Sequence, residues 1–182
     1  PPAVLEKEIR AITRLGVDIK FNTALGKDFT IDDLKAQGYK AVYVGIGAHQ
    51  SQKLNVAGED SEGVMHGVEF LRRANLGELT LGKERVIIVG GGDVAIDAAR
   101  VSTRLGAAKV SIFYRRTRTE MPARENEIED ALAEGVDIQY LTAPAEVVVK
   151  DGKVTGMKCI RMELGEPDSS GRRRPVPIAG SE

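Results

Sequence analysis

The stretch VIIVGGGDVAIDAAR, residues 86–100, contains the pattern that decides the fold. Its four apolar residues, 86–89, have the length of a buried strand, and the glycines that follow predict a tight turn. Beyond the glycines, apolar side chains recur at helical spacing. A strand, a glycine turn and a helix in this order are typical of the first unit of a parallel α/β sheet that binds a nucleotide.

The glycine elbow, residues 90–95, fits the pattern G-x-G-x-x-G/A with Gly90, Gly92 and Ala95. The first glycine permits the turn, the second lets a pyrophosphate approach the backbone, and the small third residue lets helix and strand pack closely. The free N–H groups of the helix N-terminus attract phosphate. The expected dinucleotide-binding residues are Gly90, Gly91, Gly92, Asp93, Val94 and Ala95. The alternative is a glycine turn that serves packing alone, with Asp93 as a helix cap.

The end of the next predicted strand indicates which dinucleotide binds. NAD sites usually carry an acid about 20 residues after the first glycine, where it bonds the ribose 2′-OH. This chain has Arg115 and Arg116 there, and the nearest acid, Glu120, lies beyond the strand end. Guanidinium groups bind phosphate well, and one charged hydrogen bond favours NADPH over NADH by about tenfold or more. The sequence therefore predicts NADPH; the alternative is a solvated basic strand end.

Other segments fit an α/β domain with a β-hairpin. Helical spacing and capping residues predict helices over 1–16, 30–38, 68–76 and 123–135. Apolar runs predict strands over 17–25, 41–47, 109–116 and 136–143. Asp151 and Gly152 predict the turn of a hairpin over 145–164. Residues 49–63 are expected to be a linker, and the tail over 165–182 is polar and rich in Gly and Pro.

The chain contains one internal repeat. EIRAITRLGVDIKFNTA, residues 8–24, and EIEDALAEGVDIQYLTA, residues 127–143, share identities at matched positions. Duplication explains these identities better than convergence, although helix–glycine–strand units recur in α/β proteins. The first copy continues to the apolar run 41–47, and the second has no counterpart of that run before residue 182. We therefore expect the C-terminus to be a cut within a longer domain.

Composition excludes several classes of function. The net charge of −1 gives no overall attraction to nucleic acid or to membranes, and no apolar run approaches the roughly 18 residues of a membrane span. One cysteine, Cys159, excludes an internal disulfide and any cysteine-rich metal site, and it suits a cytoplasmic protein. His49 and His66 lack metal-ligand spacing, and no catalytic residue is predicted. Hydride transfer needs positioning more than a protein proton donor, so the lack of acid–base residues does not count against an enzyme.

Several stretches together resemble one family of flavoproteins. They are VGIGAH, NVAGED, FLRRANLGE, VIIVGGGDVAIDAAR, YRRTRTEMPARENEI and RMELGEPDSSGRRRPVPIAGSE. The chain resembles the small (beta) subunit of NADPH-dependent glutamate synthase over essentially its whole length. It is also similar to the related modules of dihydropyrimidine dehydrogenase and of electron-bifurcating transhydrogenases. Ala57 stands where the resemblance leads us to expect a proline.

The resemblance implies two Rossmann-type domains, one for FAD and one for NADPH. Residues 1–63 correspond to the closing part of the FAD domain and a linker, and residues 64–182 to the NADPH domain, truncated at its C-terminus. Gly47 and Ala48 match positions beside the flavin or the nicotinamide. The rest of the FAD site and the iron–sulfur clusters of the full protein would lie outside this chain.

The implied function is hydride transfer from NADPH to FAD for onward electron transfer to a partner catalytic subunit, as in glutamate synthase. The isolated chain is expected to be inactive, because most of its flavin site would be missing. Two alternatives stay open. One is a non-catalytic, regulatory dinucleotide-binding module. The other is the same electron-input module serving another acceptor, such as ferredoxin, polysulfide or a pyrimidine.

Overall fold

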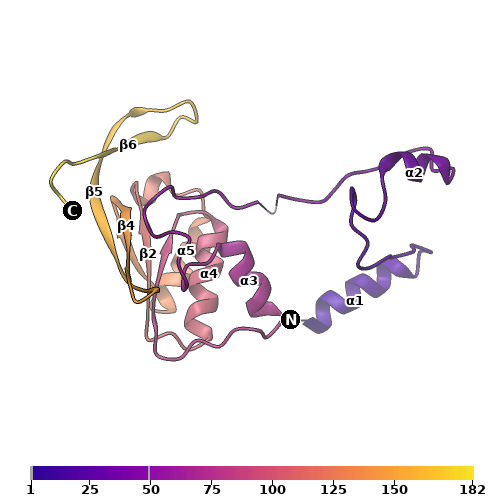
Figure 1. The fold of residues 1–182 in the computed structure, drawn as a ribbon, viewed down its shortest axis with the longest axis horizontal. Coiled ribbons are helices and arrows are strands. Elements are labelled where there is room, and N and C mark those ends of the chain that lie inside the picture. Colours follow the sequence, from indigo (N-terminus) through magenta and orange to yellow (C-terminus); the bar gives the residue numbers. More distant parts are fainter. Residues whose placement is uncertain (1, 49) are drawn as a thin grey trace. The chain divides into compact units, whose positions relative to one another are not determined.

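The computed structural model describes residues 2–48 and 50–182, and the chain forms two compact units (Figure 1). The units are Pro1–Ala48 and His49–Glu182. The contacts thus divide the chain earlier than the predicted domain boundary between residues 63 and 64. That boundary concerns two domains of the complete family fold and stays a prediction.

The first unit contains two helices, α1 (Pro2–Thr13) and α2 (Ile31–Ala36), as the sequence predicts. Thr30 caps α2 through a reciprocal capping box with Asp33, which satisfies two otherwise free N–H groups. The strands predicted over 17–25 and 41–47 are wrong, since the described part of this unit has only an isolated bridge between Leu25 and Phe29. A strand needs neighbouring strands for its ladder, and no described residue pairs with either run in that way.

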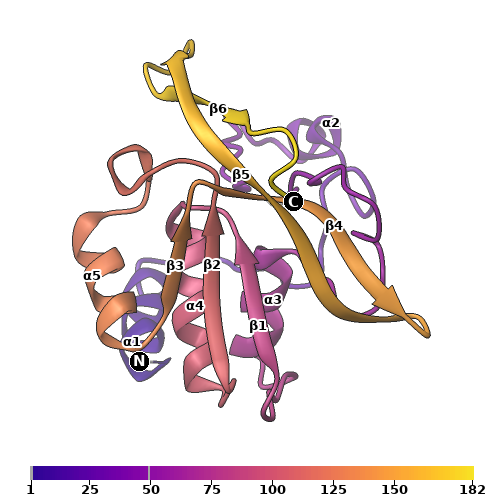
Figure 2. The same ribbon diagram turned by 90° about the vertical axis from the view of Figure 1, so that its left-hand side faces the viewer.

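The second unit begins with α3 (Gly67–Asn75) and then alternates strands with helices. The order is β1 (Arg85–Val89), α4 (Asp93–Arg104), β2 (Lys109–Tyr114), η1 (Arg118–Glu120), α5 (Glu125–Ala133) and β3 (Asp137–Tyr140). The strands form a parallel sheet in the order β1-β2-β3, side by side in Figure 2 with α4 behind them. The predicted α/β class with a parallel sheet is confirmed.

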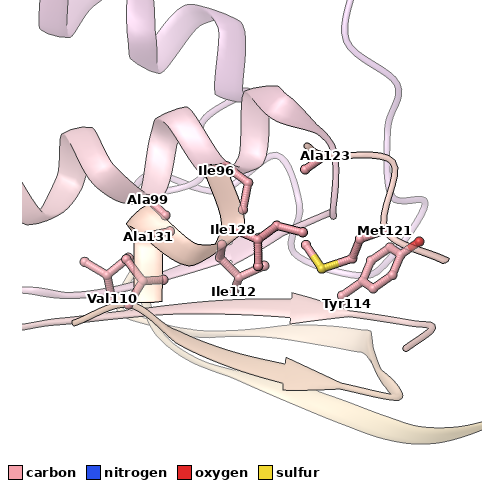
Figure 3. Close-up of a cluster of buried hydrophobic side chains, with 10 residues drawn as sticks. Ile96, Ala99, Val110, Ile112, Tyr114, Met121, Ala123, Ile128 and Ala131 are labelled. Carbon is pink, nitrogen blue, oxygen red and sulfur yellow. The ribbon is translucent and has the colours of Figure 1, made fainter. Parts of the chain in front are cut away.

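The hydrophobic core lies between one face of this sheet and the helices α4 and α5 (Figure 3). Side chains alternate along a strand, so Val110, Ile112 and Tyr114 of β2 face the helices. The buried cluster consists of Ile96, Ala99, Val110, Ile112, Tyr114, Met121, Ala123, Ile128, Ala131 and Val136. This core fixes the strand ends, because both helices that follow the strands are packed against it.

An antiparallel meander follows, with β4 (Thr142–Lys150), β5 (Lys153–Pro167) and β6 (Arg173–Pro177) in that order. Asp151 and Gly152, both with left-handed φ angles of 52° and 78°, form the predicted hairpin turn. No strand was predicted within 165–182, but β5 runs to Pro167 and pairs with β6. This β5–β6 hairpin is the yellow part of Figure 1. Its sequence is polar, so its composition does not predict that the two strands pair.

Part of the predicted linker is attached to the meander. The Val147 N–H donates to the Ala57 carbonyl at 2.9 Å, and the Val154 N–H donates to the Glu62 backbone carbonyl at 3.3 Å. Gly58 has a φ of 80°, and a methyl group there would lie 2.5 Å from the Val147 carbonyl oxygen. Residues 57–62 therefore lie directly on β4 and β5, with glycine required at position 58.

Charged side chains connect α4 with α5. Arg100 bonds Glu127 at 2.7 Å, Asp130 at 3.2 Å and Glu134 at 2.8 Å, and Arg104 bonds Glu134 at 2.7 Å. The hydrogen bonds from Arg100 and then Arg104 hold the pKa of Glu134 below its usual range. A carboxyl whose pKa is lower in the folded state stabilises the fold above its unfolded pKa, and this contribution disappears as the pH falls through the folded pKa.

We therefore expect Glu134→Gln to lower the melting temperature by about 2–4 °C at pH 7, because the ion pairs with Arg100 and Arg104 are lost. The difference from wild type should disappear at acid pH, below the lowered pKa of Glu134. Thermal unfolding between neutral and acid pH measures this. Glu129→Gln on the same helix, with a side chain 67% exposed, is the control. Equal effects of the two variants at pH 7 would contradict the assignment.

Candidate functional site

The glycine elbow lies at the carboxyl end of β1, directly beside the carboxyl end of β2. Val89 pairs with Phe113 in the parallel ladder, and the Gly90 N–H donates to the Phe113 carbonyl at 3.1 Å. Gly90 has a φ of 139°, which favours glycine over any other residue. Ligands of open parallel sheets bind at this edge, outside the carboxyl ends of the strands.

Gly91 has a packing role that the sequence pattern does not reveal. It is buried, and a methyl group there would lie 2.6 Å from two ring atoms of Tyr114. That ring cannot move aside easily, because it is itself buried and its hydroxyl donates to the Glu120 carbonyl at 2.6 Å. A large aromatic residue at the last position of β2 is the signal that points to this constraint on the elbow.

Gly92 is different, because nothing in the described chain covers it closely. Its backbone is extended, with φ −94° and ψ 176°, and a methyl group would lie 3.8 Å from Pro122. Its carbonyl accepts bonds from Ala95 and Ile96, which begin the helix. Glycine at position 92 is therefore not needed for packing, and the approach of a ligand to the backbone there stays a prediction.

The elbow presents a row of unpaired backbone donors. Within residues 2–48 and 50–182, no acceptor is found for the N–H groups of residues 91–94. Those of Gly92, Asp93 and Val94 belong to the cap and first turn of α4, where the helix dipole adds a partial positive charge. Such an arrangement binds phosphate groups.

The other elbow residues have distinct surroundings. Ala95 is buried, and its Cβ would lie 3.5 Å from a methyl group at Gly90, which explains the small residue. Val94 is 44% exposed and lies close to Gly67 of α3. The helix cap is Gly92, so the alternative interpretation of Asp93 as the cap is wrong. Asp93 is the first helical residue, and its Oδ1 accepts a long bond, 3.4 Å, from the Arg124 N–H.

The structure separates the two arginines of the predicted phosphate clamp. Arg115 is exposed, and its side chain has no bonding partner among the described residues. Arg116 is only 4% exposed, and its Nε donates to the Arg173 carbonyl at 2.7 Å. Its Nη2 donates to Asp168 Oδ2 at 2.7 Å. Because the hairpin occupies Arg116 in this way, the structure does not present two guanidinium groups to a ligand, and only Arg115 is free.

Asp168, which the sequence did not indicate, holds Arg116. It lies in the turn between β5 and β6, 52 residues from Arg116 in the chain. Its other oxygen, Oδ1, accepts bonds from the Ser170 N–H and hydroxyl. These bonds from Ser170, with a smaller contribution from the charge of Arg116, hold the pKa of Asp168 below its ordinary value. The carboxylate is therefore ionised at neutral pH.

Gly47 and Ala48, predicted to lie near a flavin, belong to the first unit. Gly47 has a left-handed φ of 70°, and Ala48 is exposed. Their place beside a cofactor stays a prediction.

The remaining candidate residues form no reactive cluster. Burial raises the pKa of the Cys159 thiol, which favours its unreactive form. Cys159 lines a cavity of about 370 Å³ between β5 and the sheet face opposite the helices, away from the elbow. His66 precedes α3 without a side-chain bond to it, and His49 lies outside the described residues. The described residues contain no group of His, Cys, Asp and Glu that could hold a metal ion.

No helix in the described part of the chain is long and apolar enough to cross a membrane.

Comparisons with known proteins identify relatives of this chain. The chain is 49% identical over 185 residues to the beta subunit of the NADP(+)-dependent formate dehydrogenase of Moorella thermoacetica. It is 45% identical over 186 residues to the beta subunit of the NADPH-Fe(3+) oxidoreductase of Geobacter sulfurreducens. It is 38% identical over 199 residues to the small chain of the NADPH glutamate synthase of Escherichia coli. The predicted resemblance to glutamate synthase small subunits and related oxidoreductases is confirmed.

These alignments include all of this chain but only 26%, 28% and 42% of the respective relatives. The chain therefore spans less than half the length of each. The family model for pyridine nucleotide-disulphide oxidoreductases matches residues 4–168, from α1 to the end of the long strand β5. This family implies binding of NAD(P)H and FAD. The chain belongs to the pyridine nucleotide-disulphide oxidoreductase family.

Proposed function

We propose that this chain is the NADPH-input part of a flavin-dependent oxidoreductase, which takes a hydride from NADPH and passes it to FAD. The observation that supports this most strongly is the row of unpaired amides of residues 91–94 beside the exposed Arg115. A dinucleotide has a pyrophosphate for the first feature, and NADPH has a 2′-phosphate for the second.

The surroundings of Glu120 support NADPH over NADH. This nearest acid is only 8% exposed, and its carboxylate accepts bonds from the Thr117 N–H and hydroxyl. Both bonds go to Oε2, and they hold the pKa of Glu120 below the usual range. A residue this buried offers little surface to a ribose 2′-OH, the group that the acid of an NAD site bonds. The free charged group at this strand end is the cation Arg115.

The chain's own residues bind and orient the nucleotide. The elbow amides would hold the pyrophosphate, and Arg115 would fix the adenosine end through the 2′-phosphate. NADPH, when bound, supplies the hydride, and FAD accepts it. Gly47 and Ala48 are proposed to lie beside the flavin, whose site would be completed by residues outside this chain. Positioning of the two rings is the main contribution of the protein to such a transfer.

The final electron acceptor is proposed only by class. The relatives named above comprise subunits of a formate dehydrogenase, an Fe(3+) oxidoreductase and a glutamate synthase. One input module serving different acceptors agrees with these names. We therefore propose onward transfer, through iron–sulfur clusters of the full protein, to a partner subunit, of which the large subunit of glutamate synthase is one candidate.

Flavin reduction separates this enzyme from a regulatory dinucleotide-binding module. We expect NADPH, added without oxygen to the complete FAD-loaded protein, to bleach the flavin absorbance. Binding of NADPH without bleaching would favour the regulatory module.

Arg115→Ala should weaken NADPH binding by about tenfold or more and leave NADH binding nearly unchanged, because only NADPH carries the 2′-phosphate. Isothermal titration of the 182-residue chain with both nucleotides measures the two dissociation constants. Arg85→Ala is the matched control, since Arg85 is also exposed but begins β1, at the opposite end of the strand from the elbow. Equal weakening of both nucleotides by Arg115→Ala would contradict the 2′-phosphate assignment.

Two adjacent glycines should give opposite results. Gly91→Ala should destabilise the fold by about 1–3 kcal/mol, since its methyl group would enter the ring of Tyr114. Gly92→Ala should change stability little, because its surroundings are open, but it should weaken both nucleotides by blocking the pyrophosphate.

Chemical denaturation and nucleotide titration of both variants test this pair. Unchanged nucleotide affinity in Gly92→Ala would place the pyrophosphate elsewhere.

A further inference from the structure

The turn between β5 and β6 contacts the strand end that carries Arg115. Asp168 Oδ2 and the Arg173 carbonyl both accept bonds from the Arg116 guanidinium, each at 2.7 Å. Asp168 in the turn and Arg173 at the start of β6 therefore both bond the side chain of Arg116. Through these two bonds the polar hairpin is attached to the chain just after β2.

Each oxygen of the Asp168 carboxylate has its own partners. Oδ1 accepts from the Ser170 N–H at 2.8 Å and from the Ser170 hydroxyl, and Oδ2 accepts from Arg116. The backbone of the turn is closed by bonds between Asp168 and both Arg172 and Gly171. The bonds within the turn therefore hold Asp168 in one orientation, so its side chain loses little conformational entropy when it pairs with Arg116.

The backbone at Arg116 is fixed as well. Its carbonyl accepts a bond from the Leu141 N–H at 3.1 Å, at the end of β3. With the main chain bonded to Leu141 and the guanidinium bonded to the hairpin, the residue has little freedom. Arg115 directly precedes it, so the direction in which Arg115 leaves the strand depends on these bonds.

We propose that Asp168 is a positioning residue for recognition of the nucleotide 2′-phosphate, acting through Arg116 on Arg115. The inference rests on the proposed function. Removing the carboxylate charge leaves the buried Arg116 cation uncompensated, which is costly in a site that is 4% exposed. Arg116 would then move toward water, and the adjoining backbone would move with it.

The effect should be selective between nucleotides. The elbow is bonded to β2 through Gly90 and Phe113 and packs on Tyr114, contacts that do not involve the hairpin. Pyrophosphate binding, which NADPH and NADH share, should therefore persist without Asp168. The contact with the 2′-phosphate, which only NADPH has, should be lost.

The test is titration of the 182-residue chain and of its Asp168→Asn variant with NADPH and NADH. We expect the NADPH dissociation constant to rise about tenfold, and that for NADH to stay within about twofold. Asp151→Asn is the matched control, because Asp151 lies in the other hairpin turn, is exposed, and has a left-handed φ that asparagine tolerates. It should leave both constants unchanged.

A double-mutant cycle with Arg116→Met tests the route. If Asp168 acts through Arg116, the double variant should lose no more NADPH preference than either single variant. Additive losses, an equal loss for both nucleotides, or an unchanged ratio in Asp168→Asn would overturn the inference. So would tighter NADPH binding, since that would mean that Asp168 withholds Arg116 from the phosphate.

The two proposals fail differently. A wild-type chain that binds both nucleotides equally contradicts the proposed function and this inference together. If the wild-type chain prefers NADPH and the Asp168→Asn variant keeps the full preference, only the inference is contradicted. If Arg116→Met does not fold, the nucleotide ratio of Asp168→Asn still decides the proposal, since that side chain is partly exposed.

Discussion

The close contact between Gly91 and the ring of Tyr114 fixes the geometry on which the rest of the site depends. The elbow after β1 lies directly against the last residue of β2, with no space for a methyl group between them. The parallel register and the bond from Gly90 to Phe113 keep the two strand ends level. As a result, the free amides of the elbow and Arg115, which follows β2, lie at the same edge of the sheet, the edge at which open parallel sheets bind ligands.

The charged residues at that edge differ in burial. Glu120 and Arg116 are buried and occupied by local bonds, whereas Arg115 remains exposed. A buried charge is tolerated only with partners, and the fold supplies them from Thr117 for the acid and from the β5–β6 hairpin for the base. The hairpin thus contacts the edge of the sheet that we propose to bind the nucleotide, although its residues are far from the elbow in the sequence.

The sequence predicted those parts of the fold that follow from local pattern. The apolar strand before Gly90, the helix after it and the turn at Asp151 and Gly152 each need only neighbouring residues, and all three were predicted correctly. The strands predicted over 17–25 and 41–47 failed because a strand also needs partners, and no described residue pairs with them in a ladder. Tyr43, 95% exposed, shows how far this run is from the buried strand that its composition suggests.

In the candidate site, too, the sequence predicted features that depend on neighbouring residues and missed those that depend on distant ones. The pattern identified the turn at Gly90 and the small residue at Ala95, and the structure shows the left-handed φ and the close packing that explain them. The pyrophosphate contact at Gly92 stays a prediction. The pattern treated Arg115 and Arg116 as equivalent, because the partner that buries Arg116 lies 52 residues away. Contacts of this kind depend on how the hairpin folds back onto the sheet, and the spacing of residues in the sequence does not predict that.

The most direct test of the central claim is an NMR titration of amide shifts with 2′,5′-ADP, which carries both phosphate groups of the adenosine half of NADPH. The account predicts that the largest shifts occur at residues 91–94 and at Arg115. Shifts concentrated instead on the cavity between β5 and the sheet, for example at Ser111 and Gln139, would contradict it.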